Sequence, residues 1–365
     1  MNTKSSLLCR KPPSGDWPLE DLQVLGACPV CQCPERKLLY TNLQDRTFFA
    51  APGNWQMWQC EYCSVGYLDP RPTKSSIGRA YAAYYTHAET AIAAANPTKL
   101  RYRLISRIRQ SLRNEFLNAQ YGYRLRPAVW GGRFIVRADP MKVYNIGWSI
   151  RHLPAPTAEH YRLLDIGSGN GSFLRFARDV LGYEAEGLEF DEKATGQATA
   201  KGSIVHVGTL PGSGLMPTRY DQITLNHVLE HLHDPVPAME EALSLLRTNG
   251  RIWIQVPSLD GASNAIFGSN SRLLEPPRHL VMYTVNSLRY LMEKVGFVMV
   301  EQVPTTHPSR SIFFQSWAIA NGYDPQSADW DDLPEYLQDQ ALAAERMYSG
   351  ISSSADTITL VGYKM

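Results

Sequence analysis

The chain has 365 residues, of which 44% are hydrophobic and 19% are charged, a balance typical of a globular protein. Its net charge of +1 gives no overall attraction to nucleic acids or anionic membranes, so DNA is not expected as a partner. No apolar run reaches the roughly 18 residues of a membrane-spanning helix, and the N-terminus lacks the apolar core of a signal peptide. We therefore expect a cytoplasmic protein.

All six cysteines lie before residue 64, and four of them form two C-x-x-C pairs, Cys28 with Cys31 and Cys60 with Cys63. Each pair fits one tight turn, and two such turns provide four thiolates for a tetrahedral Zn²⁺ ion. A site with four thiolates has no open position, so its zinc would be structural. Cys33 is near enough in the sequence to compete as a ligand.

These pairs predict a zinc ribbon over residues 28–72, preceded by a flexible arm over residues 1–27. Between the pairs, TFFA at 47–50 and WQMWQ at 55–59 are expected to form short strands.

Residues 73–155 are expected to form a helical connector that covers the substrate. From Lys99 to Arg137 there are ten Lys or Arg residues and a single acid, Glu115. A helix over 99–116 would place an apolar stripe on one face and arginines on the others. That helix is either a solvated packing element or a patch for a phosphorylated substrate, RNA or anionic lipid, which leaves peripheral membrane contact open.

The remaining residues, 156–365, alternate strands and helices, which predicts an α/β fold with a parallel, doubly wound sheet. Strands are expected at 163–166, 185–189, 204–207, 220–225, 251–256, 297–303 and 357–363, and helices at 172–181, 237–246 (ending at Asn249-Gly250) and 287–294. A helical insertion is expected over 304–354. Between the first strand and the first helix lies a loop in which Gly167, Gly169 and Gly171 alternate with other residues.

The glycine loop indicates a nucleotide-like ligand, because glycine tolerates positive φ and allows a ligand to approach the backbone. Dinucleotide sites have G-x-G-x-x-G, whereas this loop has G-x-G-x-G, which favours a nucleoside without phosphate. Glu189 lies 18 residues beyond Gly171, near the end of the second strand, where an acid can bind ribose hydroxyls.

Residues 161–303 resemble the class I S-adenosylmethionine-dependent methyltransferases, of the same broad type as the ubiquinone-biosynthesis O-methyltransferases. The matching motifs are LLDIGSGNGSFL, GLEFDEKA, YDQITLNHVLEHLHDP, LLRTNGRIWIQVPS and the segment around Gly296-Phe297. The cysteine pairs, YLDPRPT, AYAAYYTH and LLEPPRHLVMYT resemble zinc-containing sugar C-methyltransferases. This resemblance implies a Rossmann-like seven-stranded sheet with an antiparallel last strand, and S-adenosylmethionine as the cofactor.

The resemblance also implies which residues bind the cofactor: Asp165, Gly167, Ser168, Gly169, Gly171, Glu189, Phe190, Thr209, Leu210 and Asn226. Asp165 would anchor the loop and contact the ligand amino group, and Phe190 would flank the adenine. Thr209 and Leu210 would lie at the adenine edge, and Asn226 beside the methionine moiety.

The catalytic candidates follow the fourth strand, at the carboxyl edge where such sheets bind ligands. His227, Glu230 and His231 can share one helical face. By resemblance, either His231 is a general base, or the three residues bind a divalent metal. His279, in the PPRH turn, is a second candidate base, and Tyr85 could reach over the acceptor.

Two neighbouring residues carry weaker expectations. Arg278 could meet an acceptor phosphate, and His233 is expected at the surface.

The function that these features favour is methyl transfer to a small molecule, such as a nucleotide-linked sugar, glycan precursor or natural-product intermediate. One alternative is an RNA methyltransferase that uses the zinc ribbon and the arginine-rich helix. No Asn-Pro-Pro-Tyr-type base pocket follows the fourth strand, which counts against RNA base methylation. The other alternative is a non-catalytic scaffold that binds the cofactor.

Overall fold

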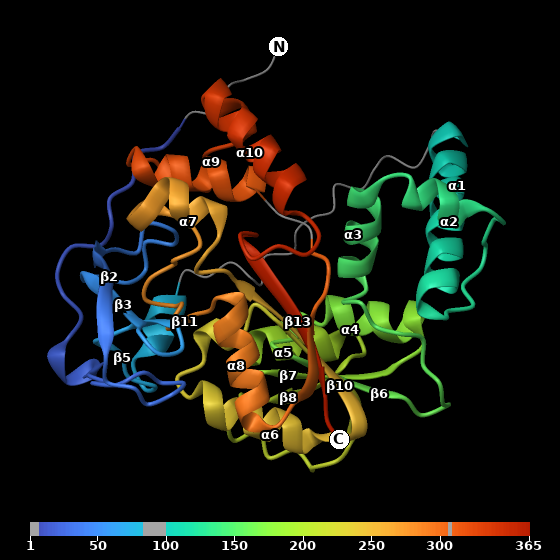
Figure 1. The fold of residues 1–365 in the computed structure, drawn as a ribbon, viewed down its shortest axis with the longest axis horizontal. Coiled ribbons are helices and arrows are strands. Elements are labelled where there is room, and N and C mark those ends of the chain that lie inside the picture. The colour runs from blue at the N-terminus through green and yellow to red at the C-terminus, as the bar shows by residue number, and fades with distance from the viewer. Residues whose placement is uncertain (1–6, 83–99, 306–308) are drawn as a thin grey trace.

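A seven-stranded sheet forms the centre of the molecule (Figure 1). The structure, a computed structural model, describes residues 7–82, 100–305 and 309–365. From edge to edge the strands are β12 (Val298–Gln302), β13 (Thr357–Tyr363), β10 (Leu246–Pro257), β9 (Tyr220–Asn226), β6 (Arg162–Ile166), β7 (Glu184–Glu189) and β8 (Ile204–Val207). β13 is antiparallel to both of its neighbours, and the pairs from β10 to β8 are parallel. The predicted fold, mostly parallel with an antiparallel last strand, is confirmed.

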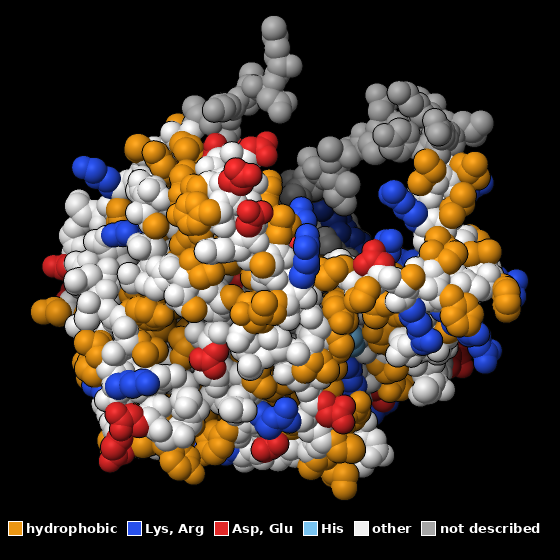
Figure 2. Space-filling model, turned by 45° about the horizontal axis from the view of Figure 1, so that its top comes forward, with side chains coloured by type: hydrophobic (Ala, Val, Ile, Leu, Met, Phe, Trp, Pro, Cys, Tyr) orange, Lys and Arg blue, Asp and Glu red, His pale blue; other side chains and the backbone are white. Residues whose placement is uncertain are grey.

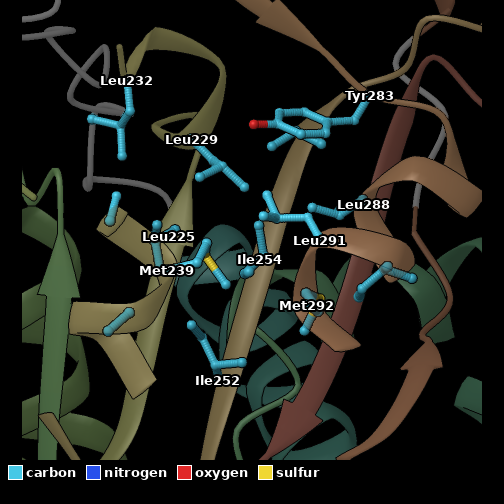
Figure 3. Close-up of a cluster of buried hydrophobic side chains, with 14 of the residues drawn as sticks. Leu225, Leu229, Leu232, Met239, Ile252, Ile254, Tyr283, Leu288, Leu291 and Met292 are labelled. Atoms are coloured by element: carbon cyan, nitrogen blue, oxygen red, sulfur yellow. The ribbon is translucent and has the colours of Figure 1, made fainter. Parts of the chain in front are cut away.

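The central strands β6, β9 and β10 are buried along most of their length, without alternation between buried and exposed residues. Parallel strands that helices cover on both faces have this pattern. The helices that alternate with the strands are α4 (Ser172–Phe176, continued by a π-helical turn, Ala177–Leu181), α5 (Glu192–Ala200), α6 (Pro235–Leu245) and α8 (Val285–Val295). Figure 3 shows the core between β9, β10, α6 and α8, filled by Leu225, Met239, Ile252, Ile254, Leu288, Leu291 and Met292.

The predicted C-cap of α6 is wrong. The helix ends at Leu245, and β10 begins at the next residue. Asn249 has a φ of 63° and lies where the register between β10 and β9 shifts, between Leu246 and Arg251. The Asn-Gly pair therefore forms an irregularity within a strand, because the left-handed conformation suits a bulge as well as a helix end.

The N-terminal part forms a second sheet that includes a strand from much later in the chain. Its order is β11 (Val281–Met282), β4 (Gly66–Leu68), β3 (Trp55–Cys60) and β2 (Arg36–Leu43). A short pair, β1 (Leu22–Gln23) and β5 (Arg71–Pro72), lies beside it. Because β11 pairs with β4, the PPRH segment is joined to the N-terminal sheet.

The strand predicted at 47–50 is absent from the second sheet. The carboxylate of Asp45 accepts hydrogen bonds from the backbone N–H groups of Phe48, Ala50 and Ala51, at 2.8–3.1 Å. These bonds curl the segment around one side chain, so its N–H groups cannot pair with a neighbouring strand.

Among the described residues, three α-helices precede the central sheet: α1 (Leu100–Tyr121), α2 (Gly132–Arg137) and α3 (Pro140–Ser149). All three lie within residues 73–155, for which the sequence predicted a helical connector. The predicted apolar stripe of α1 packs only at its C-terminal end, where Phe116 is buried, whereas Leu104 is 60% and Ile108 is 50% exposed. Figure 2 shows Lys and Arg side chains among apolar ones over α1 and α2.

The described residues between β12 and the last strand include two helices. Helices α9 (Ser309–Ala320) and α10 (Glu335–Tyr348) pack with α7 (Ala262–Phe267) around the buried ring of Phe313 (Figure 1). Within the described ranges, no helix is both long enough and apolar enough to cross a membrane.

Candidate functional site

The loop between β6 and α4 is built on three glycines in the left-handed conformation. Their φ angles are 72° at Gly167, 53° at Gly169 and 72° at Gly171. A Cβ atom at Gly167 would lie 2.3 Å from Val228 Cγ2, and one at Gly171 would lie 2.9 Å from Ala198 Cβ. At Gly169 a Cβ would meet no described atom within 4 Å. Gly167 and Gly171 are therefore required by packing, whereas Gly169 faces open space.

Glu189, at the end of β7, lies against this loop. Its side chain is buried, and its Oε2 atom accepts a hydrogen bond from the Gly169 N–H group at 2.8 Å. Its Oε1 atom accepts one from the Asp191 N–H group at 3.0 Å. The two backbone donors fix the carboxylate at the carboxyl edge of the sheet, beside the glycines, as the sequence predicted.

A cavity of about 550 Å³ opens at this edge of the sheet. The predicted cofactor-binding residues that line it are Gly167, Gly169, Glu189, Phe190, Thr209, Leu210 and Asn226. The catalytic candidates His227 and His231 line it as well, together with Tyr81, Lys74, His233 and Asp234. The structure thus brings both predicted groups to one cavity, whose volume is that of a typical small-molecule site.

Asp165, Ser168 and Gly171 lie behind the cavity wall and do not line it. Asp165 forms an ion pair with Arg151 and accepts a hydrogen bond from Thr224 Oγ1 at 2.9 Å. Burial raises the pKa of Asp165, although Arg151 and Thr224 oppose this shift. Asp165 therefore links the glycine loop to the sheet and to the residues after α3. This contact agrees with the predicted anchoring of the loop, and the predicted contact with the ligand amino group stays a prediction.

His227 is the first residue after β9, and it has an unusual backbone conformation with φ of 55°. Such strain in a residue other than glycine is common at functional sites. Its ring is partly exposed toward the cavity, and its Nδ1 atom lies 3.2 Å from Glu230 Oε1. Burial raises the pKa of Glu230, but the three histidines nearby overcome this effect, so the net shift is downward. The ionised carboxylate accepts the Nδ1 proton of His227 and leaves Nε2 as the basic nitrogen.

His231, in the 3₁₀ turn Leu229–His231, connects the cavity to residues behind it. Its Nδ1 atom lies 3.0 Å from the carbonyl oxygen of Arg278 and 3.1 Å from the hydroxyl of Tyr81. The ring of Tyr81 also contacts Phe190 edge to face, at 5.7 Å between centroids. Sequence reasoning missed Tyr81 and favoured Tyr85, which lies outside the described residues. Both belong to the run AYAAYYTH, so composition alone could not separate them.

Two residues of the PPRH turn lie away from the cavity. His279 is buried, with its Nδ1 atom 2.7 Å from the carbonyl oxygen of Leu273, and burial lowers its pKa to about 4. Arg278 is fully buried and pairs with Asp45 and Glu275. The predicted phosphate contact of Arg278 is therefore wrong, because its guanidinium is already enclosed by two carboxylates.

The prediction for His233 is also wrong. The residue is buried in the cavity wall, and its Nε2 atom lies 2.9 Å from the Pro72 carbonyl oxygen.

Four of the cysteines converge as the spacing predicted. The sulfur atoms of Cys28, Cys31, Cys60 and Cys63 all lie within 4.8 Å of one another. Cys28 is 3.6 Å from Cys63, and Cys31 is 3.4 Å from Cys60. The hydrogen bond from Cys63 lowers the pKa of Cys28 to about 5. Cys33 lies outside this group, with its sulfur 3.0 Å from Glu35 Oε2.

Comparison with known proteins finds a match for part of the chain. Residues 142–302, from α3 to β12, match a family model described as a methyltransferase domain. This segment contains the glycine loop, Glu189 and the histidines after β9. No curated protein matches the sequence.

Several solved structures are similar to the chain. One is an S-adenosylmethionine-dependent methyltransferase from Archaeoglobus fulgidus, with 18% identity and a TM-score of 0.42, covering 63% of this chain and 96% of that chain. A similar enzyme from Mesorhizobium loti has 13% identity and a TM-score of 0.41, covering 60% of this chain and 97% of that chain. Another, from Thermotoga maritima, has 19% identity and a TM-score of 0.40, covering 57% of this chain and 84% of that chain. The family model thus identifies residues 142–302, the segment that carries both predicted groups of the cavity, as a methyltransferase domain.

Proposed function

We propose that the chain transfers the methyl group of S-adenosylmethionine to a small-molecule acceptor, and that a histidine beside the cofactor removes the acceptor's proton. The observation that supports this most directly is a single cavity. Its lining includes Gly167, Gly169 and Glu189 on one side, and His227 and His231 on the other. A donor and an acceptor bound in one enclosed space can be aligned for in-line transfer and shielded from water.

In this proposal the cofactor lies along the carboxyl edge of β6, β7 and β9. The cofactor supplies the activated sulfonium methyl group. Glu189 would accept hydrogen bonds from the ribose hydroxyls, and Phe190 would flank the adenine. Thr209 and Leu210 would line the adenine edge, and Asn226 would face the methionine portion. The open space beside Gly169, which a Cβ atom would fill, fits a ligand that approaches the backbone closely.

We infer that His227 is the general base. Its Nδ1 proton is held by the buried carboxylate of Glu230, and its Nε2 atom is free to accept a proton. A carboxylate that orients an imidazole and stabilises its protonated form is a recurrent device in general-base catalysis. His231 is the weaker candidate, because its Nδ1 atom is engaged by the Arg278 carbonyl and Tyr81. His279 would act only indirectly, since it does not line the cavity.

The four cysteines are proposed to bind a structural Zn²⁺ ion, within an N-terminal ribbon at 28–72. The separations of 3.4 Å and 3.6 Å between pairs of sulfurs suit a tetrahedral ion with Zn–S bonds of about 2.3 Å. Cys28, Cys60 and Cys63 belong to the same hydrophobic core as Leu280, Val281 and Tyr283, which follow the PPRH turn. Loss of zinc would therefore disturb the packing behind His279.

The acceptor is proposed to be a small molecule that binds beside His227, Tyr81 and Lys74. The Lys74 ammonium lines the cavity and is mostly exposed, so it suits a phosphorylated acceptor, although Asp234 pairs with it. An RNA acceptor predicts salt-dependent binding that is lost when Arg103, Arg107 and Arg109 are replaced by Glu.

The test is direct. Zinc-loaded protein is titrated with S-adenosylmethionine by calorimetry, and transfer of a tritiated methyl group is then measured across small acceptors and RNA. Saturable cofactor binding with transfer to a small molecule supports the proposal. Absence of cofactor binding contradicts the cavity assignment, and transfer to RNA alone would favour the alternative acceptor. A cofactor complex that transfers to no acceptor would favour the non-catalytic scaffold.

A further inference from the structure

Helix α1, helix α2 and the loop between them expose large apolar side chains among arginines. This surface lies on the other side of the central sheet from the N-terminal sheet (Figure 1). We call it the basic-apolar face, and it consists of the exposed side chains of residues 104–110, 124–130 and 134–137. We propose that this face binds the surface of an anionic lipid bilayer. The proposal does not depend on the proposed methyl transfer.

The first support is the exposure of large apolar side chains. Trp130 is 88% exposed, and Phe134 and Ile135 are each 58% exposed. Leu104 and Ile108, on α1, are exposed by half or more. Single apolar side chains on a protein surface need no explanation, whereas a group of them that shares one surface marks a site of interaction.

Hydrogen bonding places these apolar side chains on one surface. The loop after α1 runs back along the helix, and the N–H group of Val129 donates to the carbonyl oxygen of Ser111 at 3.4 Å. Leu104 and Ile108 precede Ser111 by seven and three residues, so all three lie on the same side of α1. Trp130, which follows Val129, therefore lies beside the apolar row of α1. Helix α2 begins two residues later and packs against α1.

The second support is the charge of the same surface. Residues 104–137 contain seven arginines and a single acid, Glu115. Glu115 pairs with Arg133, which leaves the other six arginines without an acidic partner inside this segment. Basic side chains beside a bilayer bind anionic headgroups while their alkyl stems lie along the apolar region. Five of the six are exposed: Arg107, Arg109, Arg124, Arg126 and Arg137.

The composition of the basic-apolar face favours a bilayer over other occupants. A second copy of the chain would bring arginines against arginines, which repel one another. RNA would use the aromatic rings and the arginines, but it gains little from aliphatic side chains such as Leu104, Ile108 and Ile135. A bilayer uses all three classes, because its hydrocarbon accepts aliphatic side chains, its interface accepts tryptophan and its anionic headgroups attract arginine.

The experiment is co-sedimentation of the full chain with vesicles, made either of phosphatidylcholine alone or of phosphatidylcholine and phosphatidylserine in equal parts. Wild type is expected to bind the anionic vesicles more tightly, and added salt should weaken this binding. Arg107→Glu combined with Arg109→Glu should weaken it on the order of 20-fold. Lys37→Glu combined with Arg346→Glu changes the net charge equally at two exposed positions elsewhere, and it should leave the binding near that of wild type.

A second measurement tests whether apolar side chains enter the bilayer. Lipids brominated in their acyl chains should quench the tryptophan fluorescence of wild type more than that of Trp130→Phe. Trp130→Ala combined with Phe134→Ala should bind the anionic vesicles about tenfold more weakly. Tyr336→Ala, which removes an exposed aromatic ring on α10, is the control and should bind as wild type does.

Circular dichroism checks that each variant is folded. The proposal is overturned if wild type does not bind anionic vesicles, whether or not it binds RNA or another protein. It is also overturned if both pairs of substitutions on the basic-apolar face leave vesicle binding unchanged.

Discussion

The two walls of the cavity are constructed in opposite ways. The glycine wall comes from two short segments, the loop that carries Gly167 and Gly169 and the end of β7 at Glu189, and much of it is backbone. The histidine wall joins Tyr81, residues 227–231 and, behind them, the PPRH turn, and it is made of side chains. A backbone wall suits a ligand that many enzymes share, whereas a wall of side chains from distant segments can be changed to suit one acceptor.

Replacing the proposed base should have the largest effect, and it should act on one wall only. His227→Ala is expected to lower turnover by about 10²- to 10⁴-fold, because a positioned proton acceptor is lost. Affinity for S-adenosylmethionine should change little, since the glycine wall is intact. Steady-state kinetics and calorimetry give the two quantities, with His160→Ala as the control. Unchanged turnover would show that the base lies elsewhere or is not needed.

The second prediction changes the glycine wall and leaves the histidine wall intact. Gly169→Val should weaken binding of S-adenosylmethionine by about 100-fold, equivalent to ~2.8 kcal/mol, because the new side chain occupies the open space beside the loop. The fold should survive, since no described atom lies within 4 Å of the added Cβ and the cost is limited to the backbone strain of valine at a φ of 53°, about 1–3 kcal/mol. Gly196→Val, at an exposed helical position, serves as control. Wild-type affinity in Gly169→Val would refute the assignment of the loop.

A milder change tests the charge in the glycine wall. Glu189→Gln keeps the shape of the side chain but removes its charge, and we expect about tenfold weaker binding of S-adenosylmethionine, or ~1.4 kcal/mol. Turnover at saturating cofactor should stay near that of wild type. A drop in turnover with unchanged affinity would place Glu189 in the chemistry and not in binding.

The last prediction concerns the stability of the support behind the glycine wall. His152, next to Arg151, accepts a hydrogen bond at Nδ1 from the indole N–H of Trp253 at 3.2 Å. Burial lowers its pKa to about 3. The unfolded chain therefore binds this proton below about pH 6.5, whereas the folded chain does so only near pH 3.

The contribution of neutral His152 to the free energy of unfolding is thus fully present above pH 6.5, and it decreases as the pH falls toward 3. Between pH 7.5 and 5.5, His152 should account for ~1.4 kcal/mol of the loss in unfolding free energy. Urea denaturation at the two pH values measures it. His152→Gln should reduce the loss and His160→Gln should not; equal losses in the two variants would contradict this assignment.

The sequence predicted the central sheet well because its signals are local. Buried apolar strands, the glycine loop and Glu189 each carry their pattern within a few residues, and residues of one loop stay together in any fold. Predictions failed where a distant partner intervened. Residues 47–50 curl around Asp45, whose carboxylate is held in turn by Arg278, 233 residues away. Arg278 was mistaken for a phosphate contact for the same reason, because the sequence does not show which carboxylates enclose it.

The sequence by itself thus determined the fold, the glycine wall and the cysteine pairs, because spacing within a loop or a turn sets which atoms can meet. Only the tertiary structure decided the other wall. It gave His227 a buried carboxylate, placed Tyr81 at His231, and brought His279 from 48 residues beyond His231 to within 4.8 Å between ring centroids. Those contacts depend on how β11 pairs with β4 and how the loop after β9 packs, which no local pattern encodes.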